Sequence, residues 1–198
     1  MSASVEEQRA LRAALGSFAT GVTIITTHDA QAQALVGLTV NSFSSVSLDP
    51  PLVLWSIANR SASLAHFAAG QQHAIHVLSK DQEALARQFA TPQADKFSGV
   101  DYQLRSDFGA PLLAACAARF ECVTESAIPA GDHHIIVARV LRYETEPRAP
   151  LLFVRGAFAG TPAATSVPAF APVLAPALKP AASALATASG STEACATT

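Results

Sequence analysis

The chain has 198 residues, of which half are apolar and 14% are charged, and its formal net charge is -2. This length supports one domain with a sizeable core, or one domain with a tail, rather than two full domains. The charge balance excludes both a basic nucleic-acid footprint and an acidic tail, so affinity for a ligand must come from a pocket.

The cysteine pattern and the N-terminus indicate the compartment. Cys116, Cys122 and Cys195 form no CxxC pair and are interpreted as reduced, buried thiols rather than as a disulfide framework. Glu6 and Glu7 precede any apolar run, and no segment approaches the ~20 apolar residues that span a bilayer. These features predict a soluble, cytoplasmic protein.

The chain is predicted to begin with a short helix and to continue mainly as strands. In chain order, the patterns predict a helix over 4–15, strands over 22–27, 35–47 and 52–57, a helix over 61–69, a strand over 74–78, a helix over 81–90, and strands over 118–124, 134–143 and 151–154. The first two strands flank a polar turn at His28 and are expected to form a hairpin. Many strands without regular β-α alternation predict an antiparallel, mainly β fold, a barrel with helical insertions.

The composition changes sharply at Thr161. Residues 161–198 are rich in alanine and proline, and Lys179 and Glu193 are their only charges. Because this segment has few large apolar residues to offset its ordering entropy, one domain is predicted over residues 1–160, followed by a disordered tail over 161–198. An alanine-rich helix docked on the body is the alternative, although prolines interrupt every long window.

Residues 37–64 place uncharged polar side chains inside otherwise apolar strands. Thr39, Asn41 and Ser42 lie on one predicted strand, and Ser56 lies on the next. Such groups would cost about 1–3 kcal/mol each if buried without partners, so a polar ligand is predicted to satisfy them. A phosphate-bearing aromatic cofactor fits this pattern.

A predicted helix begins near Ser61. Its unpaired backbone N–H groups, with the Ser61 and Ser63 hydroxyls and Arg60 beside them, could hold a phosphate. The alternative is that Ser61 only caps the helix. The chain contains no GxGxxG and no P-loop motif, so a nicotinamide nucleotide would have to bind without either fingerprint.

The run Gly131-Asp132-His133-His134 is predicted to form a turn between two strands. There, His133 lies next to a carboxylate and could contact a nicotinamide or assist a proton transfer, whereas plain solvation is the alternative. A metal site is not expected, because His133 and His134 point to opposite faces and no Cys or His pair has ligand spacing. His76 is expected to be a hydrogen-bonded core or pocket-lining residue.

Several motifs, taken together, resemble one protein family. They are LGSFATGVTIITT (15–27), GLTVNSFSSVSLDPPLVL (37–54), DKFSGV (95–100), PLL (111–113), FEC (120–122), GDH (131–133) and PLLFVRG (150–156). In this order, over roughly residues 8–160, the chain is similar to the short-chain flavin reductases, the reductase components of two-component flavin-dependent monooxygenases. The resemblance implies the antiparallel FMN-binding split-barrel fold.

The resemblance also implies an activity. Members of the family oxidise NADH or NADPH, pass a hydride to N5 of FMN or FAD, and release the reduced flavin to a partner monooxygenase. The flavin is then closer to a co-substrate than to a prosthetic group. A homodimer is expected as well, because a small split barrel with many apolar strands leaves apolar surface exposed and family members pair across the flavin site.

By this resemblance, each candidate site residue has a role. The flavin would lie against Thr39, Asn41 and Ser42, its phosphate would bind Ser56, Ser61 and Ser63, and the nicotinamide donor would approach through His133 and residues 153–156. The full candidate site has His133 as its catalytic residue, no metal, and the cofactor-binding residues Gly37, Leu38, Thr39, Val40, Asn41, Ser42, Ser56, Ile57, Ala58, Ser61, Ser63, Phe153, Arg155 and Gly156.

Two departures and two alternatives accompany this interpretation. His73 and His76 stand where the family usually has phenylalanine and asparagine, and the tail lies outside the family pattern. A non-catalytic flavin carrier or sensor on the same fold is the first alternative, although it would not need His133 paired with Arg155 and Gly156. Pyridoxamine-phosphate oxidase-like chemistry is the second, and it would need more basic phosphate contacts than Arg60 offers. The sequence does not separate FMN from FAD or NADH from NADPH.

Overall fold

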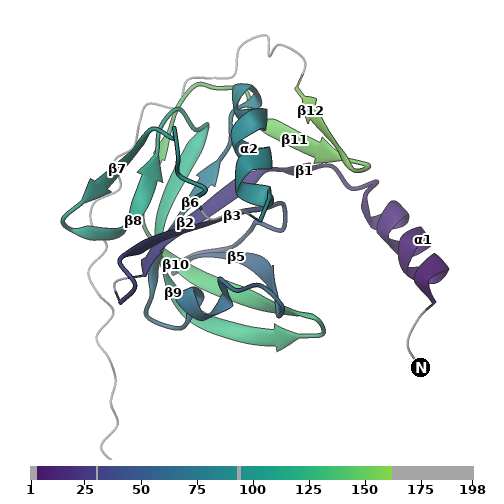
Figure 1. Cartoon of the computed structure of the whole chain (residues 1–198), viewed down its shortest axis with the longest axis horizontal. Coiled ribbons are helices and arrows are strands. Elements are labelled where there is room, and N and C mark those ends of the chain that lie inside the picture. Colours follow the sequence, from purple (N-terminus) through teal and green to yellow (C-terminus); the bar gives the residue numbers. More distant parts are fainter. Residues whose placement is uncertain (1–3, 30, 93–94, 162–198) are drawn as a thin grey trace, which may run out of the picture.

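Antiparallel strands dominate the computed structural model, which describes residues 4–29, 31–92 and 95–161 (Figure 1). Its elements are α1 (Val5–Leu15), β1 (Thr20–Gly21), β2 (Thr23–Asp29), β3 (Ala34–Val40), β4 (Ser44–Leu48), β5 (Pro51–Ala58), the 3-10 helix η1 (Leu64–Phe67), β6 (Gln72–Val77), the 3-10 helix η2 (Lys80–Gln82), α2 (Glu83–Ala90), β7 (Tyr102–Arg105), β8 (Phe108–Leu113), β9 (Ala118–Ala130), β10 (His133–Thr145), β11 (Leu151–Val154) and β12 (Ala157–Gly160). The predicted mainly β, antiparallel fold is confirmed. Except for Thr161, the predicted tail lies outside the described residues.

A seven-stranded antiparallel sheet forms the body, in the order β3-β2-β6-β9-β10-β5-β4. β3 and β4 follow each other in the sequence but lie at opposite edges of this sheet, so the chain crosses between the edges at residues 41–43. At this crossing the Ser42 hydroxyl accepts the backbone N–H of Ser56 on β5 at 2.8 Å. The prediction of one strand over 35–47 is therefore wrong, because a side chain replaces the ladder hydrogen bonds where the chain leaves one edge.

β2 is covered on both of its faces, which explains its continuous β-branched sequence. Successive side chains of a strand point to opposite sides. Ile25 packs inside the sheet with Trp55, whereas Ile24 packs on the other side with Phe89 of α2. A strand buried on both faces reads as an unbroken apolar run rather than as an alternating pattern. The predicted hairpin of β2 with β3 is confirmed.

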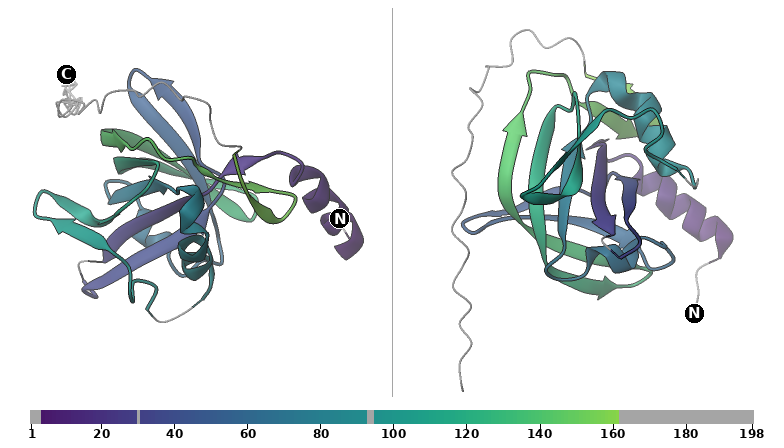
Figure 2. Two further views of the ribbon diagram at one scale, coloured as in Figure 1. Left: turned by 90° about the horizontal axis from the view of Figure 1, so that it is seen from above. Right: turned by 60° about the vertical axis from the view of Figure 1, so that its left-hand side comes forward.

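The helices differ in how they contact the body (Figure 2). α2 packs on β2 and β3, and just before it the Gln82 side chain accepts the Ser79 N–H at 3.0 Å. α1 projects away from the body, and although Ser4 and Glu7 cap it, none of its residues is buried. The predicted helix over 61–69 is only the single 3-10 turn η1. No helix within the described ranges is both long enough and apolar enough to cross a membrane.

Two smaller sheets complete the fold, and the sequence patterns did not indicate most of their strands. β7 pairs with β8, and β1, β11 and β12 form a three-stranded sheet next to the start of the chain. The turn between β11 and β12 is tied to the end of α1, because the Arg155 N–H donates to the Gly16 carbonyl at 2.6 Å. These strands have two to six residues, too short for periodicity to identify them reliably.

Candidate functional site

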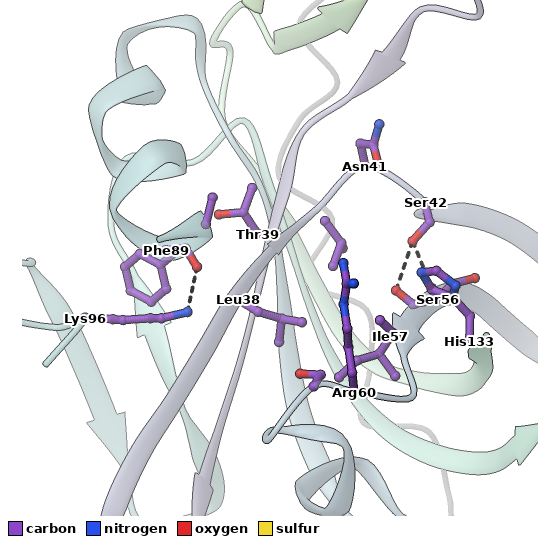
Figure 3. A pocket seen from close by; sticks show the side chains of 14 residues that line it. Leu38, Thr39, Asn41, Ser42, Ser56, Ile57, Arg60, Phe89, Lys96 and His133 are labelled. Carbon is purple, nitrogen blue, oxygen red and sulfur yellow. Dashed lines mark hydrogen bonds between the residues drawn. The ribbon is translucent and has the colours of Figure 1, made fainter. Parts of the chain in front are cut away.

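A cavity of about 480 Å³ opens where the curled sheet brings β3 close to β5 (Figure 3). β3, β5, the start of β10, the C-terminal end of α2 and the loop that follows α2 all contribute to its walls. Its lining residues are Leu38, Thr39, Val40, Asn41, Ser42, Ser56, Ile57, Ala58, Arg60, Ser61, Phe89, Ala90, Lys96 and His133. This lining includes two basic side chains, Arg60 and Lys96, and no carboxylate.

Most of the site residues expected from the sequence lie together in this lining. They are Leu38, Thr39, Val40, Asn41, Ser42, Ser56, Ile57, Ala58, Ser61 and His133. They meet because β5 pairs with β10 and because the crossing from β3 to β4 passes over the end of β5. Residues separated by about 90 positions in the sequence therefore line one cavity.

Two of these hydroxyls already have partners within the protein, so the prediction that a ligand satisfies them is wrong. The Thr39 hydroxyl donates to the Ala86 carbonyl of α2 at 2.7 Å. The Ser42 hydroxyl accepts the Ser56 N–H and donates to the Ser56 carbonyl at 3.3 Å. Both hydroxyls fix the walls of the cavity. The side chains of Asn41 and Ser56 have no hydrogen bond to another described residue and are available to a ligand.

The proposed phosphate site at a helix N-terminus also needs correction. Ser61 lines the cavity, and its hydroxyl accepts the Ser63 N–H at 3.3 Å. Ser63 does not line the cavity, and η1, which follows it, has only four residues. A single 3-10 turn lacks the aligned peptide dipoles of a longer helix. Any anion at this end of the cavity would therefore depend on Arg60 and the Ser61 hydroxyl.

His133 begins β10 at the rim of the cavity. Its Nδ1 lies 2.7 Å from Oδ1 of Asp132, and the pKa of this carboxyl is lowered chiefly by that hydrogen bond. Because an ionised carboxylate only accepts, Nδ1 carries the proton and Nε2 is the nitrogen left for a ligand. His134 takes the opposite side of the strand, where Nδ1 lies 2.8 Å from Asn59 Oδ1.

The wall formed by α2 holds residues that the sequence patterns did not predict to be in the site. Phe89 and Ala90 end α2, and Lys96 follows in the next loop. Lys96 Nζ donates to the carbonyls of Phe89 at 2.8 Å and Gly37 at 3.1 Å, and burial lowers its pKa. The only sequence feature that could have pointed to Lys96 was the family motif DKFSGV, because helix or strand periodicity does not extend into this loop.

Comparison with known proteins identifies the family. The model of the flavin reductase like domain matches residues 15–162. The chain belongs to this family. It is 46% identical over 153 residues to the FMN reductase (NADH) SmoA of Agrobacterium fabrum. The aligned residues cover 77% of this chain and 86% of SmoA. It is 40% identical over 163 residues to the reductase component of the flavin-dependent trigonelline monooxygenase of Acinetobacter baylyi, which covers 82% of this chain.

A solved structure of the family supports the same assignment. The NADH:FAD oxidoreductase SgcE6 of Streptomyces globisporus, in complex with NAD and FAD fragments, superimposes with a TM-score of 0.76 at 34% identity. The match covers 84% of this chain and 99% of SgcE6. Some relatives are longer than this chain. The chain spans only about half the length of the trigonelline monooxygenase reductase component and of a probable flavin reductase of Rhizobium meliloti.

Five residues that the family resemblance assigned to the flavin or the donor do not line the cavity of this flavin reductase-like domain. They are Gly37, Ser63, Phe153, Arg155 and Gly156. Gly37 lies behind the wall, where a Cβ atom would stand 2.3 Å from the Phe89 ring. Phe153, Arg155 and Gly156 belong to the β11–β12 hairpin near α1. Within one chain, the segment from Phe153 to Gly156 therefore does not line the cavity that His133 borders.

The two histidines that depart from the family pattern lie in the core. His73 and His76 are fully buried on β6, and neither lines the cavity. His76 Nδ1 bonds the Ile24 carbonyl and its Nε2 accepts the Leu113 N–H, both at 3.0 Å. Burial lowers the pKa of His73 to about 4 and that of His76 to about 3. Of the two expectations for His76, the hydrogen-bonded core residue is confirmed.

No metal centre is indicated by the described part of the chain. In residues 4–29, 31–92 and 95–161, no three His, Cys, Asp or Glu side chains gather closely enough to hold a metal ion. Cys116 and Cys122 are buried and free, and burial raises the pKa of the Cys116 thiol to about 11. A thiol with a raised pKa is a poor nucleophile at neutral pH.

Proposed function

We propose that this chain is an NAD(P)H:flavin reductase, which transfers a hydride from NADH or NADPH to FMN or FAD and supplies the reduced flavin to a partner monooxygenase. The observation that carries the proposal is the composition of the cavity in a flavin reductase-like domain. Two cations without a carboxylate, available amide and hydroxyl groups, and the apolar side chains of Leu38, Ile57 and Phe89 suit an anionic, aromatic ligand. SmoA and SgcE6 support the same reaction class.

The residues of the cavity would divide the work of binding. Arg60 and the Ser61 hydroxyl are suited to the flavin phosphate, since a charge-assisted hydrogen bond is stronger than a neutral one. Bound flavin would accept the hydride, and the chain would hold the two rings at transfer distance. His133 Nε2 could then accept a hydrogen bond from the carboxamide of the nicotinamide. This reaction needs no strong acid or base, and the lining provides none.

We also propose that the chain works as a homodimer. Leu15 is 67% exposed and Phe18 is 78% exposed, and both lie on or next to α1, none of whose residues is buried. An isolated helix of 11 residues is marginal in water, so its apolar side chains need a partner surface. A second copy of the chain is the occupant we expect. A wild-type protein that sediments only as a monomer would contradict this.

The remaining assignments follow from the same function. A partner monooxygenase is supported by the relative that is the reductase component of the trigonelline monooxygenase. Buried free thiols at Cys116 and Cys122 support work in a reducing compartment, the cytoplasm. A reductase unit that ends near residue 160 also remains a proposal.

The test separates a reductase from a flavin carrier. Purified protein is mixed with each pairing of NADH or NADPH with FMN or FAD, and oxidation of the nicotinamide is followed by absorbance. Turnover that depends on added flavin supports the proposal and identifies the preferred pair. Tight flavin binding without nicotinamide oxidation in any pairing would instead favour the carrier.

A further inference from the structure

Lys96 presents a fixed positive charge to the α2 side of the cavity. Two of its three N–H donors are used by the carbonyls of Gly37 and Phe89. Both acceptors are neutral, and within the described ranges no carboxylate forms an ion pair with this ammonium group. Figure 3 shows the nitrogen on the α2 side of β3, whereas the side chains of Leu38, Ser56 and His133 lie on the other side of that strand. One donor and the whole charge are therefore left for a ligand.

The loop around Lys96 is held in place independently of any ligand. The Gln88 side chain donates to the Lys96 carbonyl at 2.9 Å, and Asp95 accepts the Phe97 N–H at 2.9 Å. The Phe97 ring packs edge-on against Phe89 with centroids 5.0 Å apart. Both the backbone and the ammonium group are thus fixed before a ligand binds, which is the condition under which an electrostatic contact is most effective.

The two cations of the cavity stand in different chemical surroundings. Arg60 is next to Ser61 in a part of the lining rich in hydroxyl and amide groups, which suits a phosphate. Lys96 Nζ bonds the Phe89 carbonyl, and Phe89 and Ala90, which also line the cavity, give this part of the lining an apolar surface that suits a flat ring. A flavin placed with its phosphate at Arg60 would bring its ring, rather than a second phosphate, to Lys96.

We propose that Lys96 contacts the pyrimidine edge of the flavin ring and binds the reduced, anionic flavin more tightly than the oxidised flavin. This inference rests on the proposed reductase function. In the transfer, the C4–H bond of the dihydronicotinamide breaks and its electron pair forms the N5–H bond of the flavin. The added negative charge resides on N1, C2 and O2 of the pyrimidine edge, and no proton is consumed.

A cation fixed at that edge stabilises the product of the transfer more than the neutral flavin that enters. Only interactions that strengthen as charge develops favour the reaction. Burial lowers the pKa of Lys96, which indicates an ammonium group that has lost part of its hydration. A negative partner would compensate that loss.

The test measures binding of the two oxidation states rather than turnover. Oxidised FMN and dithionite-reduced FMN are titrated anaerobically into the wild type, Lys96→Met and Lys96→Gln. Loss of a hydrogen bond to a charged group should weaken reduced FMN by about tenfold or more in both variants, and oxidised FMN by less than about threefold. If a variant weakens reduced FMN tenfold more than oxidised FMN, the midpoint potential of its bound flavin is about 30 mV lower than in the wild type. Lys80→Met is the matched control, since Lys80 is exposed on η2.

Two other results of these titrations would contradict the role proposed for Lys96. Equal weakening of both oxidation states would assign Lys96 to the phosphate, and unchanged affinities would remove it from the site. Either result overturns the proposal. Lys96→Gln keeps an N–H donor for the two carbonyls without the charge, so it remains informative if circular dichroism shows that Lys96→Met is misfolded. If the wild type binds neither form of FMN, the proposed function itself has failed.

Discussion

His76 inside the sheet and the two basic side chains at the cavity, Arg60 and Lys96, differ in how fully the protein satisfies them. Inside the sheet, both ring nitrogens of His76 are bonded, to the backbone of Ile24 and of Leu113. At the cavity, Arg60 has no ion pair with another described residue, and Lys96 has only neutral acceptors. His76 is satisfied without a ligand, whereas the two cations have charge and donors left for one.

This difference separates residues that hold the fold from residues that bind. A buried polar group with both partners contributes to the free energy of folding, and its removal leaves other groups unpaired. A polar group without a protein partner contributes little to folding and can contribute to ligand affinity. Substitutions in the sheet interior should therefore change stability, and substitutions at the cavity should change binding.

The largest expected effect is the loss of folding stability at acidic pH that the two buried histidines cause. Burial keeps the pKa of His73 at about 4 and that of His76 at about 3, against 6.5 for a free histidine, so both rings are neutral in the folded protein. The unfolded chain binds protons on these rings below pH 6.5. Stability from this source is complete above that pH and decreases as the pH falls towards 4 and then 3, by about 2 kcal/mol per ring between pH 7 and 5.

His76→Asn tests this directly, because an amide can both donate and accept in place of the imidazole. Denaturant unfolding at pH 7 and pH 5 should show that the variant loses about 2 kcal/mol less than the wild type over this interval. His28→Asn, at a partly buried position, is the control and should lose as much as the wild type. An identical loss in all three proteins would show that His76 is not neutral in the core.

The next effect concerns the close approach of α2 to β3. In Gly37→Ala the new Cβ would lie 2.3 Å from the Phe89 ring, so that ring or the strand must shift, at a cost of about 1–3 kcal/mol. The melting temperature should fall by several degrees, and flavin affinity should fall with it, because Phe89 lines the cavity and accepts the Lys96 hydrogen bond.

Gly21→Ala is the matched control for this substitution. Nothing lies within 4 Å of a Cβ built at Gly21, so its melting temperature should stay within about a degree of the wild type. Gly37→Ala with wild-type stability would mean that α2 packs less closely on β3 than the structure shows.

The sequence predicted the parts of the fold that have a strong local pattern. The β-branched run over 22–27, the strand over 52–57 and the hairpin of β2 with β3 were read correctly because periodicity and turn residues specify them locally. The break of the strand over 35–47 was missed because it is caused by a contact with Ser56, a residue distant in sequence. Short strands such as β7 and β8 gave no periodicity to read.

The candidate site divides in the same way. Ser42, Ser56 and His133 were found because polar residues stand out within apolar strands and in a turn. Lys96 and Phe89 were missed as site residues, because a helix end and a loop become part of a cavity only through the packing of α2 on β3. Arg155 was assigned to the site by resemblance, and it does not line the cavity. No local sequence pattern indicates where the β11–β12 hairpin that carries it lies relative to the cavity.

A smaller effect separates two neighbouring serines. Ser61 lines the cavity and Ser63 does not. Ser61→Ala should weaken flavin binding by about tenfold, as expected for the loss of one hydrogen bond to a phosphate, while Ser63→Ala leaves it within about twofold. Flavin fluorescence titration of the two variants measures this. Equal weakening would show that the phosphate lies deeper, beside η1, than the cavity indicates.

The smallest effect is expected at the rim, where His133 and His134 offer a matched pair on one strand. His133→Ala should raise the KM for NADH by about two- to tenfold, the range for one neutral hydrogen bond, while flavin affinity stays near that of the wild type. His134 bonds Asn59 and does not line the cavity, so His134→Ala should leave both quantities unchanged.

Steady-state kinetics and flavin titration of both histidine variants distinguish the possible roles. Because Asp132 accepts from Nδ1, Nε2 is the nitrogen that the nicotinamide could reach, and Asp132→Ala should reproduce part of the effect by removing the acceptor that holds the imidazole. A loss of flavin affinity in His133→Ala as large as the change in KM would place the imidazole on the flavin. The rim would then bind the same ligand as Ser61, and the nicotinamide would have to enter from a part of the cavity that His133 does not border.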